Sequence, residues 1–193
     1  MTALLLGRPA FGDEPKLQTA LAQLPSVLGV QLAEHQLADV EKKLGPAKPV
    51  NNGLRAAAEA ENVCYRGADG TVLLFGARIE NAHGNGLTGF QIVRDLKMAH
   101  YGEEDEFDGA QPKKPACAAS KLVSRKLATA GVSLGQSRAQ VVEKLGPPTV
   151  ETAARLKYES HTESGEWTTT IALAVELEKE KVVAIRAAAT TSN

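Results

Sequence analysis

The chain has 193 residues, of which 43% are hydrophobic and 23% are charged, and its formal net charge is −1. This composition is that of a globular protein with one or two domains, and it argues against disorder. A nearly neutral chain lacks the positive charge with which proteins bind nucleic acid or anionic membrane surfaces, so we expect neither a nucleic-acid partner nor a basic membrane-binding surface. No apolar run reaches the roughly 20 residues of a membrane-spanning helix, so we expect no membrane span.

The amino terminus does not resemble a signal peptide. A signal peptide requires a basic start and an apolar run of about 7–15 residues, whereas residues 1–10 contain only a short leucine run. Two alternatives remain: a cytosolic chain, or a mature chain whose signal or lipid anchor lies outside this sequence.

The first unit, residues 1–95, starts with two predicted helices. Leucines recur at helical spacing over residues 14–24, and a second apolar repeat covers residues 37–44. Gly45 and Pro46 follow the second repeat, and they are expected to end that helix because glycine accepts positive φ and proline cannot continue a helix.

The hydrophobic period then changes to that of strands. The predicted strands of the first unit are residues 61–66, 71–78 and 87–94. Glycine-rich turns at residues 67–70 and 83–86 separate them.

Residues 96–117 connect the first unit to a second one. They contain an acidic run, residues 102–109, followed by a Pro-Lys segment. The acidic run lacks the alternating oxygen ligands and central glycine of an EF-hand loop. We therefore favour a solvated loop over a cation site, and we predict no metal.

The second unit, residues 118–193, repeats the first. Gly131-Val-Ser-Leu134 matches residues 29–32, and Val141–Pro147 matches residues 40–46, at offsets that differ by one residue. A helix is predicted over residues 118–128. A second helix should start with a capping box formed by Ser137 and Gln140, and it should end at Gly146 and Pro147.

The predicted strands of the second unit are residues 155–160, 167–177 and 181–189. In the middle strand, alternation places the odd-numbered residues 169–177 on the buried face. The sequence therefore predicts an α+β fold of two tandem helix-helix-antiparallel-sheet units, with helices on one sheet face and the other face free.

Cys64 and Cys117 are the only cysteines. They are too few and too widely spaced for a structural zinc site. We predict a disulfide, because the count is even and Cys117 would anchor the long connection. The alternative is two unpaired thiols in a cytosolic protein. A disulfide would indicate a protein that works outside the cytoplasm.

The sequence offers no pattern for catalysis. None of the four histidines lies at ligand spacing from another histidine or a cysteine: His35, His83, His100 and His161. The chain also lacks a Gly-x-Ser-x-Gly elbow and a phosphate-binding loop. We therefore predict that the protein is not an enzyme and takes no cofactor.

The order helix, Gly-Val-x-Leu, helix, Leu-Gly-Pro and strand meander, over residues 14–94 and 118–193, resembles a known module. It is shared by β-lactamase inhibitor protein and by small outer-membrane lipoproteins of the SmpA/OmlA type. The tandem arrangement is similar to the inhibitor, in which the two sheets form a concave surface that grips an enzyme. This chain is poorer in aromatic residues than that surface, so the resemblance does not single out a β-lactamase as the partner.

The resemblance implies a periplasmic or secreted protein that binds another protein. We expect an inhibitor or immunity protein that sterically blocks a hydrolase, a lysozyme-like enzyme or a toxin. The alternative is a structural component of envelope assembly at the outer membrane.

Aromatic residues and arginines carry much of the energy of protein interfaces. The candidate partner-binding residues are Trp167, Tyr158, Tyr65, Arg66 and Arg155. The tyrosines are expected on the free face of the sheet. For Trp167 a core position at the end of the sheet is equally open, and the arginines have the alternative of solvated strand edges.

Overall fold

The computed structural model describes residues 26–51, 59–80, 84–99 and 116–192. In the first half these residues form β1 (Ser26–Val27), β2 (Val30–Gln31), α2 (Leu37–Leu44), β3 (Val50–Asn51), β4 (Glu59–Arg66), β5 (Val72–Glu80) and β6 (Gly84–Val93). The 3-10 helix η1 (Leu96–Met98) and β7 (Ala118–Ala119) follow. The second half comprises β8 (Ala128–Thr129), β9 (Val132–Ser133), α3 (Arg138–Leu145), β10 (Val150–Glu151), β11 (Arg155–Ser164), β12 (Trp167–Glu178) and β13 (Lys181–Ser192). The two halves thus share one element order: a short hairpin, a helix, and four strands.

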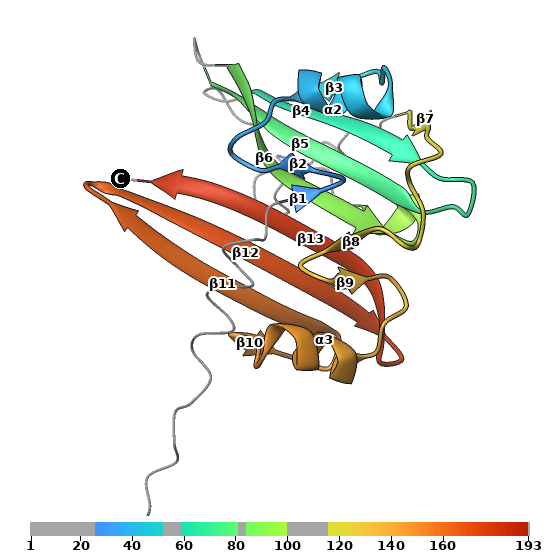
Figure 1. Cartoon of the computed structure of the whole chain (residues 1–193), viewed down its shortest axis with the longest axis vertical. Coiled ribbons are helices and arrows are strands. Elements are labelled where there is room, and N and C mark those ends of the chain that lie inside the picture. Colours follow the sequence, from blue (N-terminus) through green and yellow to red (C-terminus); the bar gives the residue numbers. More distant parts are fainter. Residues whose placement is uncertain (1–25, 52–58, 81–83, 100–115, 193) are drawn as a thin grey trace, which may run out of the picture.

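A single nine-stranded sheet runs through both halves (Figure 1). Its order is β10-β11-β12-β13-β6-β5-β4-β3, and β7 pairs with β4 in parallel. The halves join where Ala184–Ala188 of β13 pair with Gly89–Val93 of β6. The division of the chain at residues 95 and 118 remains a prediction.

The two α-helices of the described residues lie on the same face of the sheet, and their apolar side chains join one core. Leu37, Val40 and Leu44 of α2 and Val141 and Leu145 of α3 are buried in it. The predicted alternation in β12 is confirmed for Leu173, Val175 and Leu177, which are buried in the same core, whereas Thr169 and Ile171 are only partly buried.

Local signals in the sequence start and end α3 as predicted. The Ser137 hydroxyl accepts a hydrogen bond from the Gln140 backbone N–H at 3.3 Å, and Gln140 Oε1 accepts one from the Ser137 N–H at 2.9 Å. Gly45 and Gly146, which end α2 and α3, have φ of 94° and 81°. With ψ near 180° as well, both glycines occupy a region that other residues avoid.

The expected fold class is wrong. The described residues are 52% strand and 14% helix, with only two α-helices, and they do not form an α+β repeat of helix pairs on sheets. The first predicted helix of the second unit, residues 118–128, is strand β7 followed by turns. Its counterpart at residues 14–24 lies outside the described residues, as does the acidic run at 102–109.

Serine side chains and a contact from another element explain why residues 118–128 are not helical. Ser120 Oγ and Ser124 Oγ each accept a hydrogen bond from the backbone N–H two residues later, which favours turns over a helix. The Arg125 N–H donates to Asp69 Oδ2 at 2.8 Å, so the turn before β5 holds this segment. The helix prediction rested on three apolar residues, of which Val123 and Leu127 are buried in the core and Leu122 is exposed.

The sheet face opposite the helices is also partly covered. A second cluster of buried residues lies there: Cys64, Val72, Leu74, Val93, Ala99 and Ala184. Leu96 and Met98 of η1 and Cys117 pack against it. The expectation of a free second face is therefore wrong where η1 and the disulfide pack against the sheet.

Candidate protein-binding surface

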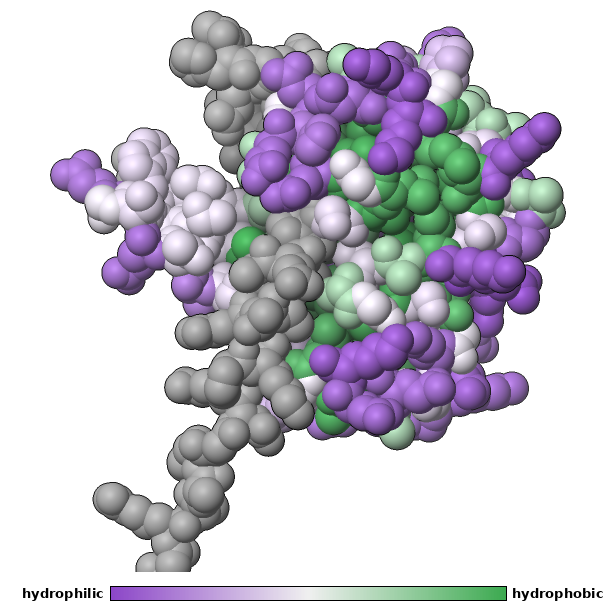
Figure 2. All heavy atoms as spheres, in the orientation of Figure 1, coloured by the Kyte–Doolittle hydropathy of each residue, from purple (hydrophilic) through white to green (hydrophobic). Residues whose placement is uncertain are grey.

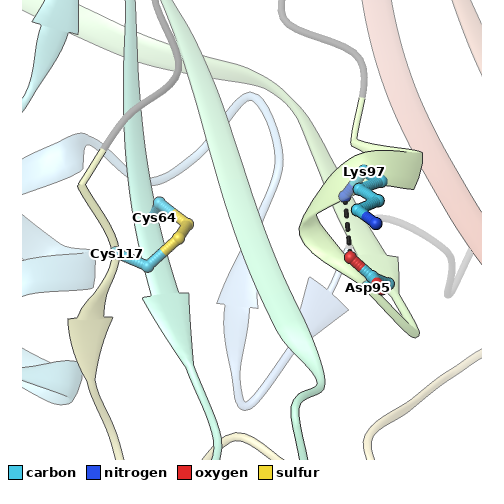
Figure 3. The surroundings of a disulfide bond; sticks show 4 residues. All are labelled: Cys64, Asp95, Lys97 and Cys117. Atoms are coloured by element: carbon cyan, nitrogen blue, oxygen red, sulfur yellow. Dashed lines mark hydrogen bonds between the residues drawn. A yellow bond between two sulfur atoms is a disulfide. The ribbon is translucent and has the colours of Figure 1, made fainter.

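Cys64 and Cys117 form a disulfide, as predicted. Their Cα atoms lie 4.4 Å apart, and the bond ties the segment before β7 to β4 (Figure 3). Figure 3 also shows η1, whose start is capped by the Asp95 side chain accepting a hydrogen bond from the Lys97 N–H at 2.9 Å. The disulfide is typical of a protein that folds outside the reducing cytoplasm.

The sheet face opposite the helices, called the open face here, carries a network of charged side chains over β11, β12 and β13. Arg155 and Arg186 both pair with Glu176, the former at 3.1 Å. Lys157 pairs with Glu159 at 2.7 Å. Each of these three cations thus has a carboxylate partner, and two of them share Glu176.

Arg186 also links the two halves of the sheet. Its Nε donates to Gln91 Oε1 of β6 at 3.2 Å, and one terminal nitrogen donates to the Met98 carbonyl at 2.6 Å. The sequence did not point to Arg186 and Glu176 as a pair, because their contact depends on which strands are neighbours in the sheet. Their only signal in the sequence is alternation, which places both residues on the face opposite the buried apolar residues of their strands.

Small residues form a low strip across the middle of the open face. Ala172, Ala188, Gly89 and Gly76 are successive cross-strand partners in β12, β13, β6 and β5. A Cβ atom at Gly89 would lie 3.0 Å from the Ala187 carbonyl oxygen, so the strands approach too closely there for a larger residue. The open face is consequently flat at its centre.

The two candidate arginines do not form one site. Arg155 is about half exposed and pairs with Glu176, and Arg66 is exposed at the end of β4. Arg155 and Arg66 lie in β11 and β4, which are five strand spacings apart in the sheet, or roughly 24 Å. The structure thus separates residues that the sequence analysis grouped together.

The expectation that Tyr65 and Tyr158 lie on the free face is wrong, because both side chains are fully buried on the helix-covered face. Each hydroxyl donates to the carbonyl of the glycine that ends the helix of its half. The distances are 2.9 Å from Tyr65 to Gly45 and 3.4 Å from Tyr158 to Gly146. These contacts are structural, and neither ring is available to a partner.

Burial, together with a smaller effect of the charge of Glu41, raises the pKa of Tyr65 to about 12. Burial likewise raises the pKa of Tyr158 to about 12, with a smaller upward effect of Glu151. Both phenols are therefore held in the neutral form that can donate a hydrogen bond.

Trp167 is the largest exposed apolar side chain of the described residues, with 52% of its surface exposed. It opens β12 and pairs with Ser164 across the turn formed by Gly165 and Glu166. Alternation places Trp167 on the same face as Leu173, so it is not on the open face. It lies beyond the core, whose edge in β12 is the partly buried Ile171.

Figure 2 shows where these properties lie on one side of the molecule. Hydrophilic side chains surround a hydrophobic area, and the end of the β11–β12 hairpin projects as a mostly pale region of intermediate hydropathy.

The two histidines of the described residues accept or share local hydrogen bonds: His35 with the Gln31 N–H and His161 with Thr170 Oγ1. His83 and His100 lie outside the described residues.

Over the part of the chain that the structure describes, no three His, Cys, Asp or Glu side chains are grouped so that they could hold a metal ion. No helix in that part is both long and apolar enough to cross a membrane.

The described residues define a β-rich protein in which two halves of like element order share one sheet and a disulfide fastens the connection between them. Comparison of the chain with protein-family models, with curated proteins and with solved structures finds no match in any of the three.

Proposed function

We propose that the protein is a periplasmic or secreted binding protein, and that it acts as an inhibitor or immunity protein that sterically blocks a hydrolase, a lysozyme-like enzyme or a toxin. The observation that carries this proposal is Trp167, which is more than half exposed at the end of the β11–β12 hairpin. Tryptophan is the residue type most enriched among interface hot spots.

Two further observations support the proposal. The disulfide fits a protein that acts among extracytoplasmic partners. The resemblance of the Gly-Val-x-Leu and Leu-Gly-Pro repeats to the tandem inhibitor module points to a steric mechanism, in which a protein surface occludes an enzyme cleft. A standard interface of about 800 Å² per partner would be enough for this.

The test is capture of a partner by the purified, oxidised chain from whole-cell and envelope extracts, followed by inhibition assays on any captured hydrolase. Replacing Trp167 with Ala should weaken binding by at least about 2 kcal/mol if Trp167 is a hot spot. Leu122→Ala is the matched control, since Leu122 is 50% exposed in the segment between β7 and β8.

Other outcomes would redirect the proposal. Capture of outer-membrane assembly proteins would favour the alternative of a structural envelope component. Failure to capture any protein under oxidising conditions would contradict a binding function.

A further inference from the structure

We infer that the end of the β11–β12 hairpin, residues 161–170, is the element that contacts the partner, and that it enters a recess lined by Arg or Lys side chains. This segment is called the hairpin tip below. The inference rests on the proposed binding function and specifies both its surface and the chemistry of the partner.

The hairpin tip is a projection of the sheet. β13 pairs with β6 only through Ala184–Ala188, whereas β11, β12 and the rest of β13 continue together beyond that point. Figure 1 shows the end of the hairpin and the end of β13 diverging from β6. A two-residue turn closes the hairpin, with Gly165 at a φ of 64°. A narrow projection of this kind can enter a concave site that a flat sheet face cannot.

The hairpin tip is held in place by hydrogen bonds on both of its faces. His161 Nδ1 and Thr170 Oγ1 are 2.9 Å apart on one face. Thr169 Oγ1 and Thr191 Oγ1 are 3.2 Å apart on the other. Because these strands are already ordered, presenting Trp167 to a partner costs little conformational entropy on binding.

The indole of Trp167 has no partner within the described residues. No hydrogen bond or ring contact to it is found there, and about half of its surface is exposed. An indole contributes most to the free energy of binding when a guanidinium or ammonium group covers its face and its apolar edge is removed from water.

The charge of the hairpin tip points to the same cations. Glu163 and Glu166 are its only charged residues, and the adjoining end of β13, residues 188–192, carries no charge. Neither carboxylate forms an ion pair in the described structure, whereas Arg155 and Lys157 at the base of β11 are paired with glutamates. Glu166 lies in the turn next to Trp167, and alternation places Glu163 on the open face of the same hairpin end. Both carboxylates would complement Arg or Lys around the hairpin tip and would repel an acidic surface.

The charge around Trp167 can be tested without a partner, because Trp167 is the only tryptophan of the chain and its fluorescence therefore reports on this site alone. Fluorescence quenching by cesium and by iodide is measured relative to the quenching of free N-acetyltryptophanamide by the same ion. The relative quenching by cesium should exceed that by iodide, since the carboxylates attract cations. The Glu163→Gln/Glu166→Gln double variant should remove this difference, and Glu143→Gln on the exposed surface of α3 should preserve it. Equal relative quenching by the two ions in the wild-type chain would overturn the assignment of negative charge around Trp167.

The partner is tested by separating an extracytoplasmic extract on a cation exchanger into basic and acidic pools and offering each pool to the immobilised full chain. The expected result is a partner from the basic pool whose Kd rises roughly 30-fold or more with Trp167→Ala. The double glutamine variant should weaken binding several-fold and reduce its salt dependence. Leu122→Ala and Glu143→Gln should leave the Kd unchanged.

The outcomes separate this inference from the proposed function. A partner from the acidic pool, or one whose affinity is insensitive to the hairpin-tip variants, overturns the inference while the binding function stands. Absence of any retained partner overturns both.

Discussion

Tyr65 and Tyr158 each link the end of a helix to the sheet through a hydrogen bond. Both are fully buried, and each hydroxyl points at the carbonyl of the glycine that follows its helix. The two contacts differ in length, at 2.9 Å for Tyr65 and 3.4 Å for Tyr158. Since hydroxyl hydrogen bonds are usually shorter than about 3.0 Å, the bond of Tyr65 is the stronger one.

Replacing Tyr65 with Phe removes this hydrogen bond and keeps the buried ring. The free energy of unfolding, measured by urea denaturation, should fall by about 1 kcal/mol. Tyr158→Phe is the matched comparison and should cost less, because its bond is longer. Equal losses for the two variants would contradict this ranking.

The raised pKa values of the two tyrosines predict a loss of stability at alkaline pH. In an unfolded chain the phenol titrates near 10, whereas in the folded protein both pKa values are raised to about 12. The unfolded state thus releases its phenolic protons first. The stabilisation is complete below pH 10 and decreases as pH rises from 10 towards 12.

The measurement is the urea midpoint as a function of pH. The Tyr65→Phe/Tyr158→Phe double variant provides the control, because lysines titrate in the same range in both proteins. A smaller alkaline decrease in the double variant is expected, and an identical decrease would show that the tyrosines do not contribute.

At the scale of elements, both helices are delimited by local chemistry. Gly146 ends α3 with a φ of 81°, and a Cβ atom added there would meet no atom within 4 Å. A substitution at this position therefore tests backbone conformation alone.

Gly146→Ala should destabilise the fold by about 1–3 kcal/mol, because alanine is strained in this conformation. The free energy of unfolding from urea denaturation checks this value. Gly86→Ala is the control, since Gly86 also has open space around it but lacks a positive φ. A comparable loss at Gly86 would attribute the effect to something other than backbone strain.

At the scale of the molecule, one sheet and one disulfide unite the two halves. β6 and β13 pair at the centre of the sheet, and the Cys64–Cys117 bond closes a sequence separation of 53 residues. A crosslink of this span restricts the unfolded chain more than a short one would.

Reduction of the disulfide should lower the free energy of unfolding by about 2–4 kcal/mol. The comparison is between oxidised and reduced wild-type protein in urea, with both thiols counted by mass after alkylation. A Cys64→Ser/Cys117→Ser variant should show no effect of reductant. If oxidised and reduced protein unfold at the same urea concentration, the bond does not stabilise the fold.

The sequence by itself determined the features that depend on near neighbours in the chain. The repeat of helix and strand signals, the Ser137–Gln140 cap, the positive φ of Gly45 and Gly146, and the buried side of β12 all follow from interactions within a few residues. The disulfide was predictable too, because two cysteines allow only one pairing within the chain.

The tertiary structure alone decided what depends on residues far apart in the chain. The union of the halves through β6 and β13, the burial of Tyr65 and Tyr158, and the turn conformation of residues 118–128 arise from long-range contacts. The exposure of Trp167 also depends on the tertiary structure, because it is determined by how far the elements that cover the sheet extend along β12. A one-residue change of register would reverse the face of every side chain in a strand, and only the complete sheet fixes that register.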